Sequence, residues 1–208
     1  MGADWLNEHG ELLRLGISGL TAVVWLVYLQ LFLLSLRRQR RSQIMINRGV
    51  GAGVDALCFV GNLGHEPIYV LELIGEVETG GRRFDAVITD RRDLSRDELN
   101  DPREAANQGP LKSGESYDAG SFRDIADKVL RAHEEQAGGA FDRIALTVVA
   151  ATAASGEPVA ARRSYRRSGE GDAAALRPES IQPRQIRSLL ERRRLKRRLR
   201  RDLEVDAA

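Results

Sequence analysis

The chain has 208 residues, with 32 basic and 30 acidic side chains and a formal net charge of +2 at neutral pH. This length is enough for one domain of ordinary size with additional segments. The single cysteine, Cys58, excludes an intramolecular disulfide and is consistent with a reducing compartment. Charge is segregated, because Arg184–Arg201 holds ten basic residues and one acid, so an acidic body precedes a basic C-terminal segment.

The N-terminal part of the chain predicts a membrane anchor. Leu15–Leu36 reads LGISGLTAVVWLVYLQLFLLSL, which is uncharged and long enough at about 1.5 Å per residue to span the hydrocarbon core of about 30 Å. A secretory signal peptide would need a basic start and a small-residue cleavage site. Here Asp4, Glu8 and Glu11 precede the span, and it ends in Leu-Arg-Arg-Gln-Arg-Arg. We therefore expect a retained transmembrane helix over residues 15–36 after a short N-terminal segment, residues 1–14.

The arginines around this span predict its orientation. Arg37, Arg38, Arg40 and Arg41 follow the span, and only Arg14 lies just before it. Positive residues are retained on the cytoplasmic side of a membrane. We therefore expect the N-terminus to lie outside and the C-terminal domain in the cytoplasm. Because the composition, rich in Ala, Gly and Arg, is typical of a GC-rich bacterial genome, the expected location is a bacterial inner (plasma) membrane.

One face of the span carries a stripe of small hydroxyl-bearing and aromatic residues at 3-4-3-4-3 spacing. These residues are Ser18, Thr21, Trp25, Tyr28, Phe32 and Ser35. Trp25 and Tyr28 fall near the middle of the membrane, away from the interfaces where such rings usually gather. The stripe indicates a packing seam for a second copy or for another membrane protein. Chance alignment is the alternative. Gln30 lies off the seam and could hydrogen-bond to a partner helix.

Short runs rich in Val, Ile, Phe and Tyr and broken by Gly and Asn predict strands between residues 42 and 167. They cover residues 42–47, 55–62, 68–78, 83–90, 111–120, 143–153 and 158–166. Thr79-Gly80-Gly81 predicts a turn between the third and fourth runs, and Ser155-Gly156-Glu157 predicts one between the last two. In the last run we expect Tyr165 to pack inward and the arginines to lie outside.

Helical patterns interrupt these strands at two places. Ser121 predicts the N-cap of a helix that runs to about Glu135 and carries an apolar face. The polar stretch 91–108 predicts one or two short helical turns on an exposed loop, because Ser95 and Glu98 fit a capping box.

Six or seven short strands joined mainly by turns predict an antiparallel β-sandwich. The order of CFVGNLGHEPIYVLELI, PLKSGES and LTVVAATAASGEPVAARRSY resembles that of immunoglobulin-like domains of bacterial membrane-attached proteins. This resemblance implies a mainly β, immunoglobulin-like sandwich over residues 42–167 with one inserted helix, and it implies no activity. The Cys…Trp…Cys signature of immunoglobulins is absent, because Cys58 is the only cysteine and no Trp lies in this region.

The residue patterns predict no catalytic, cofactor-binding or metal site. Gly49-Val-Gly-Ala-Gly-Val lacks the spacing and the following helix of a dinucleotide-binding fingerprint. Neither His65 nor His133 has a second His at metal-ligand spacing. Cys58 alternates with apolar neighbours, which predicts a core thiol rather than a nucleophile. The acids between Asp90 and Glu104 lie among arginines, which predicts a solvated, ion-paired face.

The C-terminal region predicts a linker, residues 168–180, followed by a basic helical tail, residues 181–208. The charge of the tail gathers in Arg192, Arg193, Arg194, Lys196, Arg197, Arg198, Arg200 and Arg201. Three roles compete: a solvated or partly disordered tail, adhesion to anionic lipid, and binding of an acidic protein or nucleic acid. Nucleic acid is least favoured, because no stacking aromatic residue accompanies the arginines. Folding back onto the acidic body is a further alternative.

These patterns together predict a single-pass, membrane-tethered cytoplasmic interaction or scaffold domain without catalytic activity. Its expected partners are the lipid bilayer and a protein, or a second copy, bound through the transmembrane helix. The alternative is an accessory membrane subunit whose basic C-terminal helix binds anionic lipid or nucleic acid.

Overall fold

The computed structural model describes residues 2–39, 42–88, 107–135, 141–153, 155–169, 174–188, 190–193 and 195–197. The chain divides into two compact units, Met1–Arg41 and Ser42–Ala208. Most of the predicted polar loop 91–108 lies outside the described residues, as does the end of the basic tail from Arg198 onward.

The described residues of the first unit form helix α1 (Gly2–Gln39). Within it, Arg14–Ser35 is a 22-residue stretch that is long and apolar enough to cross a membrane. Every side chain in this stretch is exposed. The prediction of an apolar helix near the N-terminus is therefore confirmed, with bounds one residue away from those expected.

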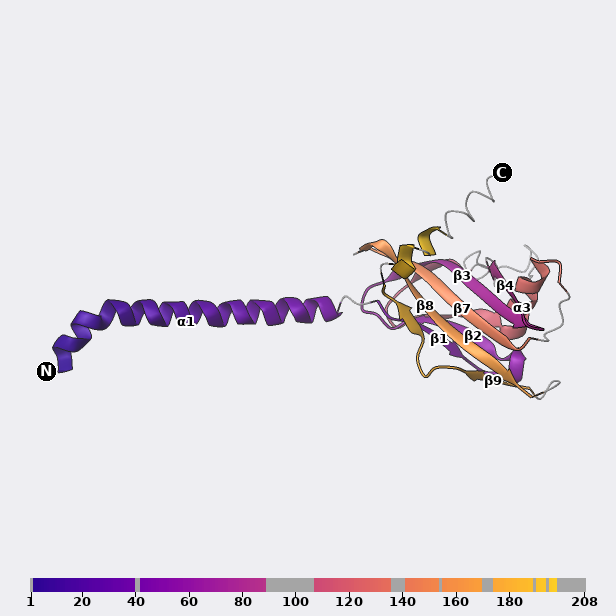
Figure 1. Cartoon of the computed structure of the whole chain (residues 1–208), viewed down its shortest axis with the longest axis horizontal. Coiled ribbons are helices and arrows are strands. Elements are labelled where there is room, and N and C mark those ends of the chain that lie inside the picture. Colours follow the sequence, from indigo (N-terminus) through magenta and orange to yellow (C-terminus); the bar gives the residue numbers. More distant parts are fainter. Residues whose placement is uncertain are drawn as a thin grey trace. The chain divides into compact units, whose positions relative to one another are not determined.

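The second unit is mainly β, and all of its strand pairs in the described residues are antiparallel (Figure 1). The small sheet has the order β1-β2-β6, made of β1 (Ile44–Arg48), β2 (Leu57–Asn62) and β6 (Ser116–Ser121). The large sheet has the order β10-β8-β7-β3-β4, made of β10 (Arg184–Ile186), β8 (Ser155–Ser168), β7 (Arg143–Thr152), β3 (Ile68–Thr79) and β4 (Arg82–Val87). In addition, β5 (Gly109–Leu111) pairs with β3 and β9 (Ala175–Pro178) pairs with β8.

The predicted hairpins are present, and one turn is displaced. Between β3 and β4, Gly80 and Gly81 have φ angles of 55° and 77°, which a tight primed turn requires and glycine adopts without strain. Between β7 and β8, Thr152 pairs with Ser155. The turn therefore precedes Ser155, and the predicted turn Ser155-Gly156-Glu157 is wrong because those residues already belong to β8.

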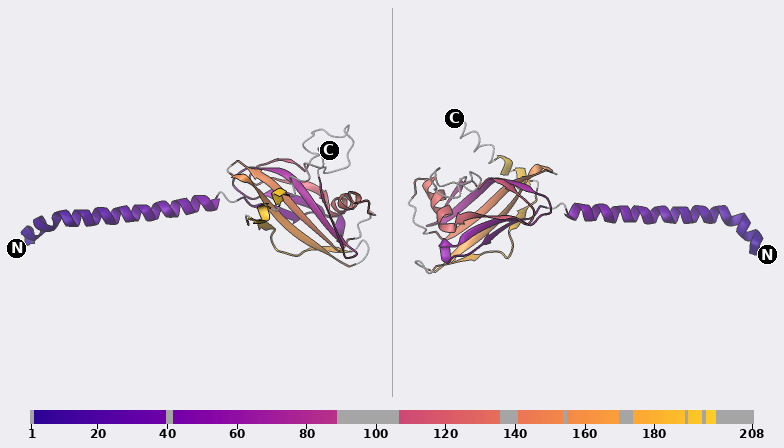
Figure 2. Two further views of the ribbon diagram at one scale, coloured as in Figure 1. Left: turned by 45° about the horizontal axis from the view of Figure 1, so that its top comes forward. Right: turned by 180° about the vertical axis from the view of Figure 1, so that it is seen from behind.

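One hydrophobic cluster joins the two sheets and helix α3 (Phe122–Arg131) on the same side of the large sheet (Figure 2). It includes Ile44, Ile46 and Val60 of the small sheet, Leu73, Val77, Ile144 and Leu146 of the large sheet, and Phe122, Ile125 and Val129 of α3. Gly75 of β3 lets the helix approach closely, because an added Cβ there would lie 2.7 Å from Cγ2 of Val129.

Helix α3 begins where the sequence predicts. The backbone N–H of Asp124 donates to Oγ of Ser121 at 3.0 Å, and the backbone N–H of Ser121 donates to Oδ2 of Asp124 at 3.4 Å. This reciprocal capping box satisfies two N–H groups that a helix start leaves unpaired. The helix ends at Arg131, a few residues before the expected end near Glu135.

The C-terminal region differs from its prediction as a linker and a helix. Ala175–Pro178 form β9 inside the predicted linker 168–180, and Arg184–Ile186 form β10 instead of a helix start. Among the described residues of the tail, those at 190–193 and 195–197 are helical. The long strand β8 explains this difference, because its outer edge offers backbone hydrogen-bonding groups that both short strands satisfy.

Candidate functional site

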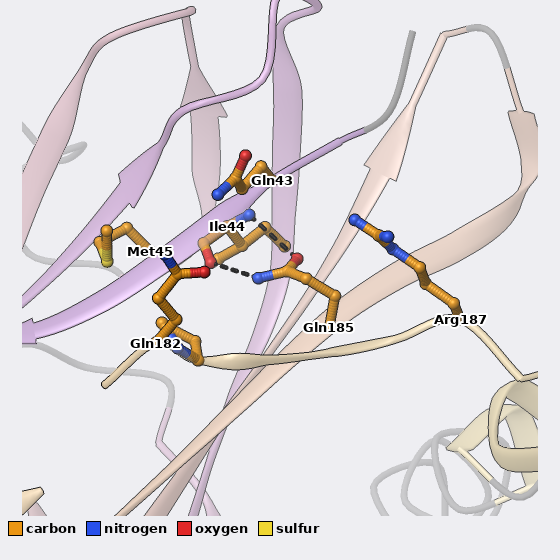
Figure 3. A pocket seen from close by; sticks show the side chains of 7 residues that line it. Gln43, Ile44, Met45, Gln182, Gln185 and Arg187 are labelled. Atoms are coloured by element: carbon orange, nitrogen blue, oxygen red, sulfur yellow. Dashed lines mark hydrogen bonds between the residues drawn. The ribbon is translucent and has the colours of Figure 1, made fainter. Parts of the chain in front are cut away.

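A groove lies where the small and large sheets come together at one edge. Its volume is about 300 Å³, and its lining consists of Gln43, Ile44, Met45, Gln182, Pro183, Gln185 and Arg187 (Figure 3). We call it the β1–β10 groove. In the described residues β1 and β10 share no backbone ladder. The groove brings the first strand of the domain beside the start of the basic tail, since Ile44 and Gln185 are 141 positions apart in the sequence.

The side-chain carboxamide of Gln185 bridges this groove. Its Nε2 donates to the carbonyl oxygen of Ile44 at 2.7 Å, and its Oε1 accepts from the backbone N–H of Ile44 at 3.2 Å (Figure 3). A neighbouring antiparallel strand would offer the same pair of donor and acceptor. The side chain of Gln185 therefore takes the place of a backbone partner and covers part of the open edge of β1.

Arg163 of β8 holds the next part of β1. Its side chain is buried, with 6% of the residue surface exposed. The two Nη atoms donate to four neutral acceptors: the carbonyl oxygens of Ile46 (2.6 Å), Ser180 (3.2 Å) and Ile181 (3.0 Å), and Oδ1 of Asn47 (3.1 Å). The prediction that the arginines of this strand lie outside is wrong for Arg163. The two-residue period of a strand places it on the same inward face as Tyr165.

Tyr165 and Cys58 are fully buried near this arginine. The hydroxyl of Tyr165 donates to the carbonyl oxygen of Ile46 at 3.3 Å, and its ring lies edge-on to Phe122 at 4.6 Å between centroids. Burial raises the pKa of the Tyr165 hydroxyl, and burial together with the nearby Asp118 carboxylate raises the pKa of the Cys58 thiol. Both groups are therefore protonated at neutral pH, and the prediction of a core thiol is confirmed.

The opposite, outer face of the large sheet carries charges in pairs. The carboxylates of Glu76, Glu78 and Glu179 each pair with two arginines, drawn from Arg83, Arg143, Arg162 and Arg166. Arg143 Nε donates to Glu179 Oε2 at 2.9 Å, and this hydrogen bond holds the pKa of Glu179 below its usual range. On this face each of the four arginines therefore has a glutamate as its partner.

The start of the basic tail folds back beside these pairs. Ile74, Val149, Ala160 and Ile186 form a second buried cluster, and Leu195 packs against it. Arg184 Nη2 pairs with Glu191 Oε1 at 2.5 Å. Between tail and sheet lies a hollow of about 260 Å³, lined by Ile74, Glu76, Thr147, Arg162, Ile186, Glu191 and Leu195. Among the described residues of the tail, Ile186 and Leu195 thus pack on the large sheet, which agrees with the fold-back that the sequence left as an alternative.

The six predicted seam residues all lie in the apolar stretch of α1, and their side chains are exposed. The hydroxyl of Thr21 donates to the carbonyl oxygen of Ile17 at 2.8 Å, so it is satisfied within its own helix. Trp25, Tyr28 and Phe32 are among the most exposed large side chains of the described chain. Helix pairing through the seam stays a prediction.

The predicted basic clusters are only partly described. Arg37 and Arg38 belong to α1, whereas Arg40 and Arg41 lie outside the described residues. In the tail, Arg192, Arg193, Lys196 and Arg197 belong to helical residues, and Arg194, Arg198, Arg200 and Arg201 lie outside the described residues. Sequence reasoning missed Gln185 and Arg163. Arg163 lies two residues before Tyr165, so the alternation of side chains along β8 could have indicated that it points inward. No local signal marks Gln185.

The described residues place no group of three or more His, Cys, Asp or Glu side chains where it could hold a metal ion. His65 is exposed, and Nε2 of the exposed His133 lies 2.9 Å from the carbonyl oxygen of Asp85.

Searches against protein-family models, curated proteins and solved structures find no match to this chain.

Proposed function

We propose that this protein is a single-pass, membrane-tethered interaction or scaffold protein without catalytic activity. The observation that carries the proposal is the stretch Arg14–Ser35, whose 22 residues are apolar enough on average to cross a membrane and are exposed along their whole length. Keeping such a surface in water costs about 25 cal/mol for each Å² of apolar area. A lipid bilayer, or a bilayer and a partner helix, removes this cost.

We further propose that the β domain has an immunoglobulin-like arrangement. The order β1-β2-β6 corresponds to strands A-B-E of immunoglobulin sandwiches, and the order β4-β3-β7-β8 corresponds to C′-C-F-G. This correspondence supports the resemblance noted in the sequence, although the fold carries no activity of its own. Rigid sheets with loops at both ends suit the binding of a protein partner.

The proposed location is a bacterial inner membrane, with the N-terminus outside and the β domain in the cytoplasm. The four arginines after the span support it through the positive-inside rule. A reporter enzyme that works only in the periplasm should be active when fused before Met1 and silent when fused after Ala208. The reverse pattern would contradict this orientation.

Partner binding is tested by a pull-down of the full-length chain in mild detergent. The parallel samples are the anchor alone, residues 1–41, and a chain that ends at Pro183. We expect a fixed protein partner with the full-length chain that is absent from the anchor alone. A chain that recovers only lipid, or that recovers the same proteins as the anchor alone, would refute the proposed role of the β domain.

Helix pairing through the seam is tested by disulfide cross-linking in native membranes. Thr21→Cys and Tyr28→Cys place a thiol on the seam, whereas Val23→Cys and Leu34→Cys place one on the opposite face. The buried Cys58 gives no background. We expect oxidised dimers from the seam variants alone. Equal cross-linking on both faces, or none on either, would refute self-association through the seam.

A further inference from the structure

The structure ties the beginning of the β domain to the beginning of the basic tail. Both hydrogen bonds between Gln185 and Ile44 cross the β1–β10 groove, and Arg187 lines the same groove as Gln43 (Figure 3). In the sequence, Ser42 follows Ser35, the last residue of the apolar stretch, by seven positions. A chain of seven residues reaches at most about 25 Å, whatever the angle between the two units.

Exposed positive charge gathers where the tail leaves this groove. Arg187, Arg193 and Arg197 are exposed and take part in no ion pair within the described residues. The one acid between Arg184 and Arg197, Glu191, is already paired with Arg184. The outer face of the large sheet differs, because its arginines are paired with glutamates. The tail therefore offers cations to an external anionic partner.

The helical part of the tail also has two apolar residues with different surroundings. Leu195 packs on the domain, whereas Leu190 is 68% exposed and lies close in sequence to Arg187 and Arg193. An exposed leucine among basic residues on a helical segment is typical of segments that lie at a membrane surface. The packing of Leu195 on the domain keeps this segment attached to the large sheet.

We propose that Arg187, Arg193 and Arg197, on the tail segment that Gln185 holds at the β1–β10 groove, bind anionic phospholipid headgroups of the same membrane that holds α1. The inference rests on the proposed membrane anchorage, which keeps the tail close to lipid at high effective concentration. Each basic residue near an anionic surface strengthens such binding about fivefold. Two attachments, α1 and the tail, then fix which side of the β domain faces the bilayer and leave its other surfaces open to partners.

Lipid fits this segment better than nucleic acid does. Proteins that bind single-stranded nucleic acid add stacked aromatic rings to their positive charge. Residues 184–197 contain no Phe, Tyr or Trp. The leucine at position 190 instead offers an aliphatic side chain, which the interface between headgroups and acyl chains accepts.

The test uses the full-length chain in nanodiscs with a donor fluorophore on Ser188→Cys and an acceptor on lipid headgroups. Cys58 is fully buried, so the chain without the Ser188 substitution serves as the labelling control. Discs of phosphatidylcholine are compared with discs that also contain phosphatidylglycerol. Energy transfer should be higher in the anionic discs. It should fall to the neutral-disc value between about 0.1 M and 1 M salt, as the Debye length shrinks from about 10 Å to 3 Å.

A triple variant tests whether the exposed arginines carry the effect. Arg187→Gln, Arg193→Gln and Arg197→Gln together should lower the ratio of bound to unbound tail about a hundredfold. The matched control removes the same charge elsewhere on the domain, through Arg82→Gln, Arg166→Gln and Arg177→Gln. The control should keep the energy transfer of the unsubstituted chain.

Three results would overturn the inference. Equal energy transfer in neutral and anionic discs would exclude headgroup binding. An equal loss of energy transfer in the triple variant and in its control variant would exclude the tail as the binding site. Removal of the tail from anionic discs by a short oligonucleotide at equal phosphate concentration would assign it to nucleic acid. A chain that does not enter nanodiscs at all would refute the membrane anchorage itself, and the inference with it.

Discussion

Substitution of Gly75 tests how helix α3 packs on the large sheet. In Gly75→Ala the new Cβ would lie 2.7 Å from Cγ2 of Val129 and 3.4 Å from Cγ2 of Ile125. Overpacking of a dense core by one methyl group costs about 1–3 kcal/mol. At about 2–4 °C per kcal/mol for a domain of this size, the melting temperature should fall by several degrees. Thermal unfolding of the full-length chain in mild detergent, followed by the circular dichroism of the β domain, measures this loss.

A second substitution decides whether the clash with Val129 causes the loss of stability in Gly75→Ala. Val129→Ala alone removes two buried methyl groups and should cost about 1.5–2.5 kcal/mol. The double variant Gly75→Ala/Val129→Ala should lose about 1–2 kcal/mol less than the sum of the two single losses, because the new methyl group fills the space left by the old ones. Gly19→Ala, which adds a Cβ with no atom within 4 Å, should leave the melting of the β domain unchanged. Additive losses would refute the packing of α3 on Gly75.

Three shorter predictions concern other parts of the domain. Gln185→Leu should speed amide hydrogen exchange of Ile44 about fivefold through the lost hydrogen bond; unchanged exchange would contradict the bridge. Because Arg143 lowers the pKa of Glu179, their pairing stabilises the folded chain above the unfolded pKa of about 4.3 and is lost as pH falls through the lower folded pKa. Glu179→Gln should therefore weaken the loss of unfolding free energy on acidification and cost under about 1 kcal/mol of stability at neutral pH. An unchanged pH dependence of the unfolding free energy below about pH 5 would argue against the pair. Cys58 should resist maleimide until the chain is unfolded, and labelling of the folded chain would place the thiol at the surface.

Several features of the fold followed from local sequence. The apolar helix is predictable because membrane spanning depends on the length and composition of one continuous segment. The turn at Gly80 and Gly81 and the cap at Ser121 are predictable because each depends on residues only a few positions apart. Strand β7 was also predictable, because its run RIALTVVAAT is rich in β-branched and apolar residues.

The C-terminal region shows where local reasoning fails. Helix-forming residues from Arg184 onward predicted a helix, yet residues 184–186 pair with β8 as β10. Helix propensity differs by less than about 0.7 kcal/mol between ordinary residues, so an unsatisfied strand edge in the folded domain outweighs it. The prediction could not include this edge, because its position depends on how the whole large sheet assembles.

The sequence by itself determined the apolar N-terminal helix, the antiparallel β character of the domain, the capped helix and the segregation of charge. Each of these depends on composition or on spacing within a short window. Only the tertiary structure decided that Arg163 meets the carbonyl oxygen of Ile46, that Gln185 completes the edge of β1, and that the basic tail starts beside the first strand of the domain. Those features join residues more than a hundred positions apart, and strand register and packing decide which of them meet.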